Sequence, residues 1–451
     1  MKNPPSCVFR VPGCRHGLAG LSLFALVAAP AAFGSAIYQD GASARSKALG
    51  GNATAAADAP LDALASNPAA LSEVRGPTLE VGIDTGFVHG EFSNSANRGN
   101  EMNDAGVMGH GAISYPFGPV TLGLGIIPTA TLRADWRFRD APGGLDGLTS
   151  YGFRTHKSEI SVLRFALGGS YRITQTFSAG ASVGLLYNRN RLEAPYTLQT
   201  QPALAGAKVL LDLETEGWGA DAQFGFLWKP LETLKLGVSY TLQSRVKSEG
   251  RAFAEARTQL KNLGVEGVDS SATFDAEVTN TFPQILSAGA AWQATPKLGL
   301  FAQIDWINWA GSFDTLEVRL RKVDNPLYYS LLGDKNNLDD DVPLDWHDQW
   351  VFRFGAEYAL DEHWTLRAGY RYSPNPVPST TLTPTTAAVN EHEITVGIGY
   401  KSGPVSVDLA YQWLPKASEH TSHTKLLNSE YVNSDVDVEI HWLSLTTTVE
   451  F

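Results

Sequence analysis

Beyond about Pro77 the sequence alternates apolar residues with small, polar or charged ones over long segments. Residues 405–413, for example, read VSVDLAYQW. A period of two is that of a β-strand with one apolar face. The segments are long for a soluble β-sandwich, and many of their apolar faces end in an aromatic residue, as at Trp306 and Tyr400. This pattern is typical of a transmembrane β-barrel, and a soluble β-protein is the alternative.

Fourteen such segments follow one another, an even number as in bacterial outer-membrane barrels. They start near Pro77, Ala105, Pro119, His156, Thr176, Val209, Thr233, Phe274, Lys297, Trp346, Glu362, Glu391, Gly403 and Asp437. Short turns alternate with long loops near 91–104, 133–155, 195–208, 249–272, 313–345, 373–390 and 415–436. Because short turns of such barrels face the periplasm and long loops face outward, we expect both termini on the periplasmic side.

The apolar phase changes within the last segment. Apolar side chains occupy even positions over 436–442, whereas Leu443 and Leu445 continue at odd positions. One extra residue in a strand shifts its phase, so we expect a β-bulge near Trp442 or a strand that starts there. The terminal Phe451 resembles the signal by which outer-membrane barrels are recognised for insertion.

The N-terminal residues 1–34 have the pattern of a secretory signal peptide. A basic stretch with Lys2, Arg10 and Arg15 precedes a short apolar run over 18–32, and small residues follow. We expect cleavage after Gly34 or Ala36. A single transmembrane anchor is the alternative, but it would need about 20 apolar residues.

Composition excludes several kinds of chemistry. Both cysteines, Cys7 and Cys14, precede the apolar run, so the mature chain would have no disulfide, no thiolate metal site and no cysteine nucleophile. The formal net charge of −12 argues against nucleic acid as a partner. The simplest interpretation is that solvated loops contain His420, His423 and the acidic run 339–341. We therefore expect no metal, no cofactor and no enzymatic activity.

Residues 35–76 differ from the rest, because they are rich in Ala and Gly and do not alternate. Asp58 precedes Pro60, and Asn67 precedes Pro68, which is typical of helix starts. A segment with short helices before a large barrel predicts a plug, or hatch, inside the barrel of residues 77–451. The alternative is a flexible periplasmic tail.

Several motifs together resemble a known family. The run 50–58 reads GGNATAAAD, and 66–71 reads SNPAAL with Asn67, Pro68 and Ala69 at its centre. Later, 363–370 reads HWTLRAGY, and 376–378 reads PVP. These motifs are similar to the hatch and late barrel of the FadL-type outer-membrane transporters of long-chain fatty acids and other hydrophobic compounds, which include the TodX-like aromatic hydrocarbon channels.

The resemblance implies a monomeric barrel in the outer membrane of a Gram-negative cell, in contact with membrane lipid and lipopolysaccharide. It implies uptake of long-chain fatty acids or other hydrophobic molecules. The ligand would pass from outer loops to a site in the lumen near the first hatch residues, Ile37 and Tyr38. It would leave sideways through an opening at the third strand. The alternatives are an aromatic or aliphatic hydrocarbon channel of the same family, or a permanently plugged structural or adhesive barrel.

Pro128 is the residue we assign to this lateral opening, because it lies within the third strand after Gly123 and Gly125 and cannot donate a backbone hydrogen bond. Alternatively, Pro128 simply ends the strand. In the family a Gly often follows shortly after, and here residues 129–131 read TAT.

Three arginines with lumen-facing phase are candidate ligand-binding residues: Arg367 first, then Arg353 and Arg371. A guanidinium can bind a carboxylate through two hydrogen bonds. The alternative is that such inward charges form a structural network that bonds the hatch. Glu317 stands where fatty-acid transporters can carry a basic residue, which favours a neutral hydrophobic ligand.

Overall fold

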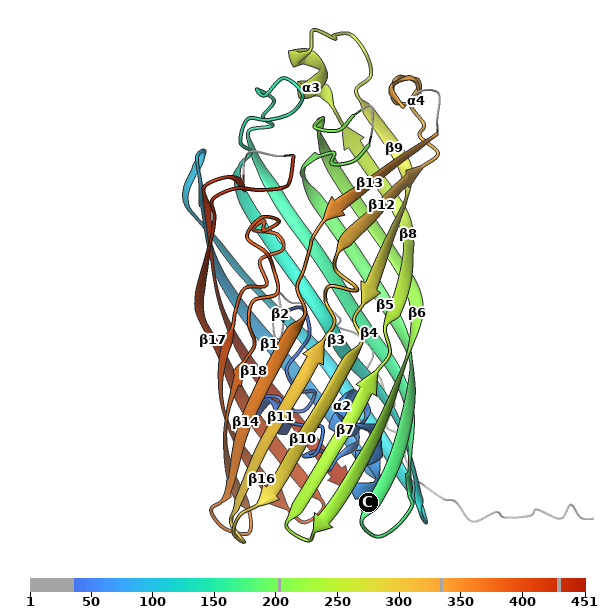
Figure 1. The fold of residues 1–451 in the computed structure, drawn as a ribbon, viewed down its shortest axis with the longest axis vertical. Coiled ribbons are helices and arrows are strands. Elements are labelled where there is room, and N and C mark those ends of the chain that lie inside the picture. The colour runs from blue at the N-terminus through green and yellow to red at the C-terminus, as the bar shows by residue number, and fades with distance from the viewer. Residues whose placement is uncertain (1–35, 202–203, 333–335, 428–430) are drawn as a thin grey trace, which may run out of the picture.

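The computed structural model describes residues 36–201, 204–332, 336–427 and 431–451, so the predicted signal peptide lies outside the described residues. One antiparallel sheet closes on itself around a long axis (Figure 1). The ladder between the first and last strands, from Thr78 with Glu450 onward, completes the closure. Within the described part of the chain, the helices are too short and too polar to cross a membrane.

Over the described residues, eighteen strand segments form this sheet. They are β1 (Thr78–Asn94), β2 (Asn97–Phe117), β3 (Val120–Arg139), β4 (Phe153–Arg172), β5 (Phe177–Thr197), β6 (Lys208–Leu231), β7 (Leu234–Thr241), β8 (Ser244–Glu255), β9 (Ser271–Phe282), β10 (Ile285–Gln293), β11 (Leu298–Ile307), β12 (Thr315–Arg321), β13 (Asn337–Pro343), β14 (Gln349–Ala359), β15 (Trp364–Tyr372), β16 (His392–Ser402), β17 (Val405–Thr421) and β18 (Ser434–Glu450). Four barrel strands each consist of two consecutive segments: β7 with β8, β9 with β10, β11 with β12, and β13 with β14. The predicted barrel of fourteen strands is therefore confirmed.

The strands reach further outward than the apolar pattern predicted. The expected loop over 91–104 is mostly strand, because β1 and β2 stay paired until Asn94 faces Asn97. Likewise β17 continues to Thr421, inside the expected loop over 415–436. Outside the membrane a strand needs no apolar outer face, so the alternation that marked the lipid-facing part stops before the strand does. Two short helices, α3 (Arg257–Asn262) and α4 (Pro326–Leu331), lie in the outer connections.

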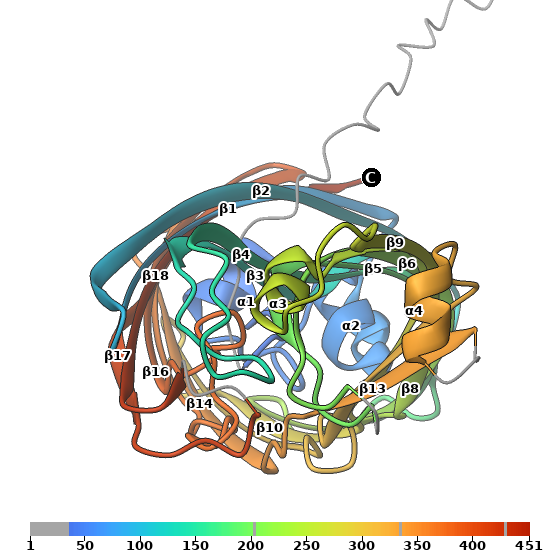
Figure 2. The same cartoon turned by 90° about the horizontal axis from the view of Figure 1, so that it is seen from above.

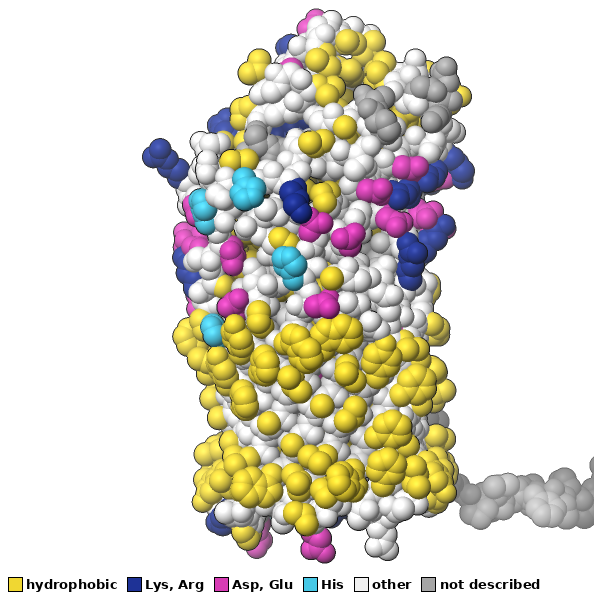
Figure 3. Space-filling view, in the orientation of Figure 1, with side chains coloured by type: hydrophobic (Ala, Val, Ile, Leu, Met, Phe, Trp, Pro, Cys, Tyr) yellow, Lys and Arg dark blue, Asp and Glu magenta, His cyan; other side chains and the backbone are white. Residues whose placement is uncertain are grey.

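The predicted bulge near Trp442 is wrong. The ladder of β18 with β1 runs without a shift past the pair Trp442 and Gly86. Trp442 and Ile440 point inward and are buried, whereas Leu443 and Leu445 are 46% and 40% exposed on the outer surface. The phase changes because the apolar face passes from the lipid side to the lumen side where the strand leaves the membrane. Figure 3 shows the matching outer surface, an apolar band in the lower half with charged side chains above it.

The hatch, residues 36–76, lies inside the barrel (Figure 2). It contains α1 (Ala44–Ala48), α2 (Pro60–Ser66) and a short 3-10 helix, η1 (Pro68–Glu73). The Asn67 side chain accepts a hydrogen bond from the Ala69 backbone N–H, as expected of an N-cap residue. Asp58 does not have that role, because α2 is capped by Ala59 and the Asp58 carboxylate instead lies 3.3 Å from the Arg45 guanidinium.

The barrel wall contacts the hatch through glycines. At seven wall positions, an added Cβ would lie within 3.0 Å of a hatch atom: Gly168, Gly180, Gly225, Gly237, Gly355, Gly369 and Gly397. At Gly225, for example, the Cβ would collide with the Asn67 side chain. The hatch backbone makes this close approach at Gly180, Gly237, Gly355 and Gly369, and hatch side chains make it at the other three positions. A side chain on the wall would displace the hatch at these points.

We predict that Gly225→Val destabilises the folded protein by about 1–3 kcal/mol, the usual cost of overpacking a filled site. The measurement is the free energy of unfolding in urea of the protein refolded into lipid vesicles. Gly109→Val is the matched control, since a Cβ at Gly109 would meet its nearest neighbour at 4.0 Å. Equal stability of both variants would show that the hatch does not need this close approach.

Candidate functional site

Two of the predicted arginines bind one carboxylate of the hatch. Asp40 forms ion pairs with both Arg353 and Arg371, the latter with Nε at 3.2 Å from Oδ2. Arg353 Nε also lies 2.7 Å from Asp305 Oδ2, and Arg371 Nε lies 3.2 Å from Glu393 Oε2. All five side chains are buried. The two arginines thus connect the hatch to β11, β14, β15 and β16.

Arg367, the first-ranked candidate, is also surrounded by protein carboxylates. Its Nε lies 2.6 Å from Glu357 Oε2, and its Nη1 lies 2.6 Å from Asp408 Oδ1. Arg45 of the hatch shares Glu357 at 3.1 Å. Burial opposes a charge on Arg45, but Asp58 and Glu357 raise its pKa above the ordinary value. A ligand carboxylate would have to compete with these groups, so binding of ligand by the three arginines stays a prediction.

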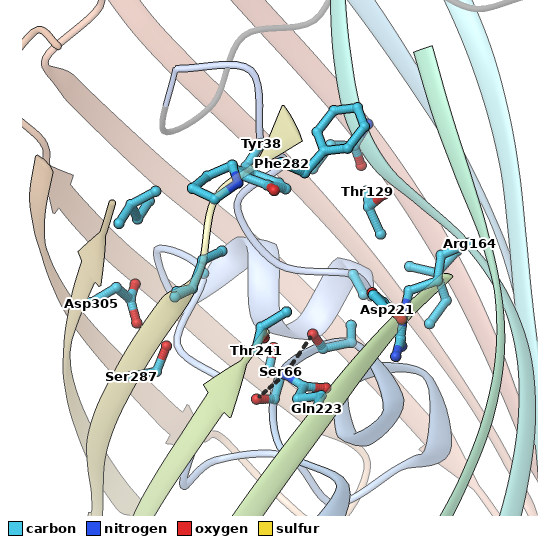
Figure 4. A pocket seen from close by; sticks show the side chains of 18 of the residues that line it. Tyr38, Ser66, Thr129, Arg164, Asp221, Gln223, Thr241, Phe282, Ser287 and Asp305 are labelled. Carbon is cyan, nitrogen blue, oxygen red and sulfur yellow. Dashed lines mark hydrogen bonds and ion pairs between the residues drawn. The ribbon is translucent and has the colours of Figure 1, made fainter. Parts of the chain in front are cut away.

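A cavity of about 160 Å³ lies against the hatch in the lumen (Figure 4). Tyr38 and Phe282 lie in its upper part in this view, and Ile127 and Ile307 are among its other apolar lining residues. Its lower part is polar, with Ser66 and Gln223 joined by a hydrogen bond of 2.9 Å from the Gln223 side chain to the Ser66 carbonyl. The cavity therefore presents an apolar surface on one side and a polar surface on the other to a bound molecule.

Of the two predicted hatch residues, Tyr38 lines this cavity, and Ile37 is not among its lining residues. Ile37 is fully buried, and Tyr38 lines the cavity with its ring centroid 5.4 Å from that of Trp309. Burial raises the pKa of Tyr38, so its phenol is neutral. Trp309 in turn packs against Phe313 and Trp346. These aromatic rings belong to a large apolar cluster that fills the outer half of the lumen.

Beside the cavity, β2 and β3 part. Their ladder runs from Phe117 with Val120 to Gly111 with Ile126, and it ends there. Both strands continue: β2 stays paired with β1 as far as Asn97, and β3 with β4 as far as Arg139. We call this parting, between residues 97–110 and 127–139, the seam. Because β3 continues well beyond Pro128, the alternative that Pro128 ends the strand is wrong.

At the start of the seam, the hatch takes the place of β2. Thr131 N–H donates to the Ile37 carbonyl at 2.8 Å, and Gln39 N–H donates to the Thr129 carbonyl at 3.3 Å. Tyr38 and Ala130 form the bridge between them. The pairing of β3 with β4 shifts between Pro128 and Ala130, so one extra residue bends β3 at this point. The first hatch residues thus form a short added strand on β3.

Further along the seam, side chains connect the two strands. Met108 Sδ lies 3.4 Å from Gln39 Nε2 and 3.9 Å from Thr131 Oγ1. Met102 Sδ accepts a hydrogen bond of 3.2 Å from the Asp135 N–H. Arg133 Nε lies 3.0 Å from Asp104 Oδ2. The sequence analysis missed both methionines, although a signal was present: they are the only methionines after Met1.

Pro128 separates this cavity from a second hollow. The hollow measures about 250 Å³ and includes Met108, Leu163, Tyr187 and Arg189 among its lining residues. Tyr187 and Leu163 belong to the outward-facing side of their strands, so the hollow lies on the outer surface. Pro128 and Val162 line both spaces. At this point the lumen cavity and the outer hollow therefore lie on opposite sides of the same two wall residues.

Gly123 and Gly125 do not lie at the seam with Pro128. Both lie in the paired part of the β2–β3 ladder, opposite Ser114 and Ala112. A Cβ at Gly125 would lie 3.1 Å from the Leu64 side chain of the hatch. Their assignment to an opening is therefore corrected, because they allow close packing of the hatch below the seam.

The hatch motif also joins hatch and wall. The Asn67 side-chain amide donates to the Thr54 carbonyl at 2.7 Å and to the Phe226 carbonyl of β6 at 3.1 Å. Pro68 and Ala69 approach the wall at Gly180. These three residues hold the lower hatch in place, at a distance along the chain from the residues that meet β3.

A closed barrel with an apolar outer band, an internal hatch and a cavity beside the wall defines an outer-membrane β-barrel protein with a plugged lumen. A sequence model of the outer membrane protein transport protein family (OMPP1/FadL/TodX) matches residues 23–451. The chain belongs to this family, and it is a protein of the Gram-negative outer membrane.

Relatives and solved structures agree with this assignment. Outer membrane protein P1 of Haemophilus influenzae is 24% identical over 302 residues, which cover 61% of this chain and 60% of the relative. The long-chain fatty acid transport protein of Escherichia coli is 20% identical over 249 residues, which cover 49% of this chain and 52% of the relative. The matches thus span only about half to three fifths of these relatives.

The fold is similar to that of two solved structures. The Pseudomonas putida toluene transporter TodX superposes with a TM-score of 0.70 and 20% identity, covering 92% of this chain and 100% of TodX. A Pseudomonas aeruginosa FadL homologue gives a TM-score of 0.71 and 17% identity, covering 92% of this chain and 100% of that chain.

We predict that Arg353→Ala destabilises the protein by about 3–5 kcal/mol, because it leaves buried carboxylates without one of their partners. Urea unfolding in lipid vesicles measures this free energy. Arg321→Ala is the control: its ion pair with Asp339 is exposed, and such pairs contribute about 0–1 kcal/mol. A loss as small for Arg353→Ala as for the control would contradict a role in fixing the hatch.

Proposed function

We propose that the protein takes up small, neutral, hydrophobic molecules and releases them sideways through the seam between β2 and β3. One observation carries the proposal: the lumen cavity and the outer hollow share Pro128 and Val162 at the place where β2 leaves β3. A molecule in the cavity is therefore separated from the outer hollow by Pro128 and Val162, which line both spaces.

A sideways route suits an apolar cargo. Each CH₂ group gains about 0.8 kcal/mol on leaving water, so a path into lipid is favoured over one into the periplasm. The same lipid penalises unpaired backbone groups. At the seam, the groups of Thr129 and Thr131 bond to the hatch and not to β2. Withdrawal of residues 37–39 would then open a path without breaking the β2–β3 ladder.

The cavity favours a ligand of about one aromatic ring. A dry protein cavity of about 150 Å³ holds benzene, and the cavity here measures about 160 Å³. A long-chain fatty acid needs considerably more room. Among the relatives, TodX is named a toluene transporter and the Escherichia coli protein a long-chain fatty acid transport protein. The volume of the cavity supports a ligand of the size of toluene over a long-chain fatty acid.

The charges at the cavity also favour a neutral ligand. Two arginines line it, and each already has a carboxylate partner: Arg164 lies 2.8 Å from Asp221, and Arg353 lies 2.7 Å from Asp305. A ligand carboxylate would displace one of these or stand beside it as a like charge. A neutral hydrocarbon meets neither cost. Fatty-acid uptake remains the second candidate, since Arg353 and Arg164 are within the cavity lining.

We expect a disulfide across the seam to reduce transport. In Met108→Cys/Thr131→Cys, the two side chains that now touch would be bonded, and the hatch segment between β2 and β3 would be trapped. Uptake of labelled toluene by cells should fall on oxidation and recover with reductant.

The matched control for the seam lock is Tyr115→Cys/Leu122→Cys. These residues face each other in the paired part of the same two strands, on the lipid side. Full uptake by the oxidised seam variant would place the exit elsewhere. Loss of uptake after deletion of residues 37–39 would contradict a gate made by the hatch, because their withdrawal is what opens the path.

Labelled toluene and labelled oleate separate the two ligand classes. We expect toluene uptake, and no oleate uptake, in a host that lacks its own fatty-acid channel. Arg367→Ala should leave toluene uptake intact if the arginine has a structural role. Oleate uptake that falls with Arg367→Ala would instead support a carboxylate-binding transporter. Uptake of neither compound by a correctly inserted barrel would favour a permanently plugged structural barrel.

A further inference from the structure

The barrel wall has a second break, on the side away from the seam. The ladder of β7 with β10 ends at Thr241 and Ile285, and the ladder of β8 with β9 begins at Ser244 and Phe282. Residues 242–243 and 283–284 lie between these two ladders. Figure 1 shows β7 ending and β10 beginning below the level where β8 begins and β9 ends, and Figure 2 shows β10 on the side of the barrel opposite β2. We call this place the second break.

The neighbouring strands are interrupted at the same level. β11 ends at Ile307 and β12 begins at Thr315, whereas β13 ends at Pro343 and β14 begins at Gln349. The interruptions turn aromatic side chains into the lumen, where Trp309 is fully buried. At the second break itself, Pro283 has no N–H to give to a ladder. Its sequence therefore favours an interruption at this point.

The lumen cavity reaches the second break. Among its lining residues are Leu242, Ser244, Phe282 and Pro283, which border the break on both sides. Leu242 is 40% exposed on the barrel and nevertheless lines the cavity. At its other end, the same cavity touches Pro128 at the seam. One cavity thus extends from one interruption of the wall to another.

Hydrogen bonds from side chains cover the second break on the outside. The Gln243 amide donates to the Gly311 carbonyl at 2.7 Å and to Ser312 Oγ at 3.1 Å, and so reaches across the intervening strand. The Tyr240 hydroxyl donates to the Gln284 side chain, whose amide donates to Asn308 Oδ1 at 3.2 Å. Exposed bonds of this kind exchange readily with water, and each contributes only about 0.5–1.5 kcal/mol.

The level of the second break suits a passage to the membrane. Tyr240 and Trp306 face Leu286 from the two neighbouring strands, beside the second break. Aromatic residues of this kind are enriched where lipid meets water. A molecule leaving the cavity between Leu242 and Pro283 would therefore meet the boundary between lipid and water. Displaced backbone groups there can bond to water, which avoids the penalty of the hydrocarbon core.

We propose that the second break is a second lateral opening of the lumen cavity, with Leu242 and Pro283 at its edges and the Gln243 side chain as its cover. It serves the small hydrophobic ligand of the proposed function. It differs from the seam in one respect: the hatch residues 37–39 pair with β3 and not with this side of the wall. Passage through it therefore does not require the hatch to move.

Access to the cavity from lipid can be measured with one cysteine. Ser287→Cys places a thiol in the cavity lining, in a mature chain that is otherwise free of cysteine. The protein is reconstituted in lipid vesicles, and N-phenylmaleimide, a membrane-soluble reagent with one ring, is added. We expect labelling to continue when the seam is locked by the oxidised Met108→Cys/Thr131→Cys pair. In that background, Leu242→Trp should slow labelling several-fold.

Two further variants make the test decisive. Val238→Trp is the matched control, because Val238 is 45% exposed on the lipid face of the same strand and does not line the cavity. It should leave the rate unchanged, whereas Gln243→Ala should raise it by removing the cover. The inference is overturned if Leu242→Trp labels as fast as Val238→Trp, or if the seam lock alone abolishes labelling. Failure of the proposed function is a separate result, since it is read as toluene uptake that does not fall at all when the seam is locked.

Discussion

Within lipid, every backbone hydrogen-bonding group of a barrel needs a partner, so the wall can part only where something replaces the missing strand. The ladders from β17 through β18 and β1 to β2 satisfy this condition. The seam is the exception. There β3 loses β2 after Ile126 and gains Ile37 and Gln39 of the hatch within five residues. The hatch is therefore part of the wall at this point as well as a plug of the lumen.

The contents of the lumen also change along the barrel axis. Around the lower hatch, glycines and ion pairs fill the space, with Asp40 held by two arginines. Above it, strands such as β18 turn their apolar residues inward, because their outer faces stand in water. The cavity lies where the polar hatch meets this apolar cluster. Its mixed lining follows from that position, and so does its contact with Tyr38, the hatch residue nearest the seam.

The sequence alone predicted the barrel of fourteen strands, because alternation with a period of two is a local signal. The role of Pro128 at an opening stays a prediction. The sequence did not predict how far the strands extend, since alternation identifies a face only while lipid borders it. It could not assign the partners of Arg367 or Arg353, which come from strands and hatch residues far apart in the chain. Gly125 was assigned the wrong role, because a glycine can occur at a bend or at a close contact. Only the fold shows which of the two applies.

The two interruptions of the wall show different solutions to one problem. At the seam, backbone groups near the kink are paired by a piece of chain that can withdraw, so opening is coupled to the state of the hatch. At the second break, side chains such as Gln243 cover a short gap at the level of the aromatic residues, where water can replace lost bonds. A cavity in contact with both need not depend on a single gate. Two such exits would let the ion pairs of Asp40 hold the hatch firmly without confining the ligand.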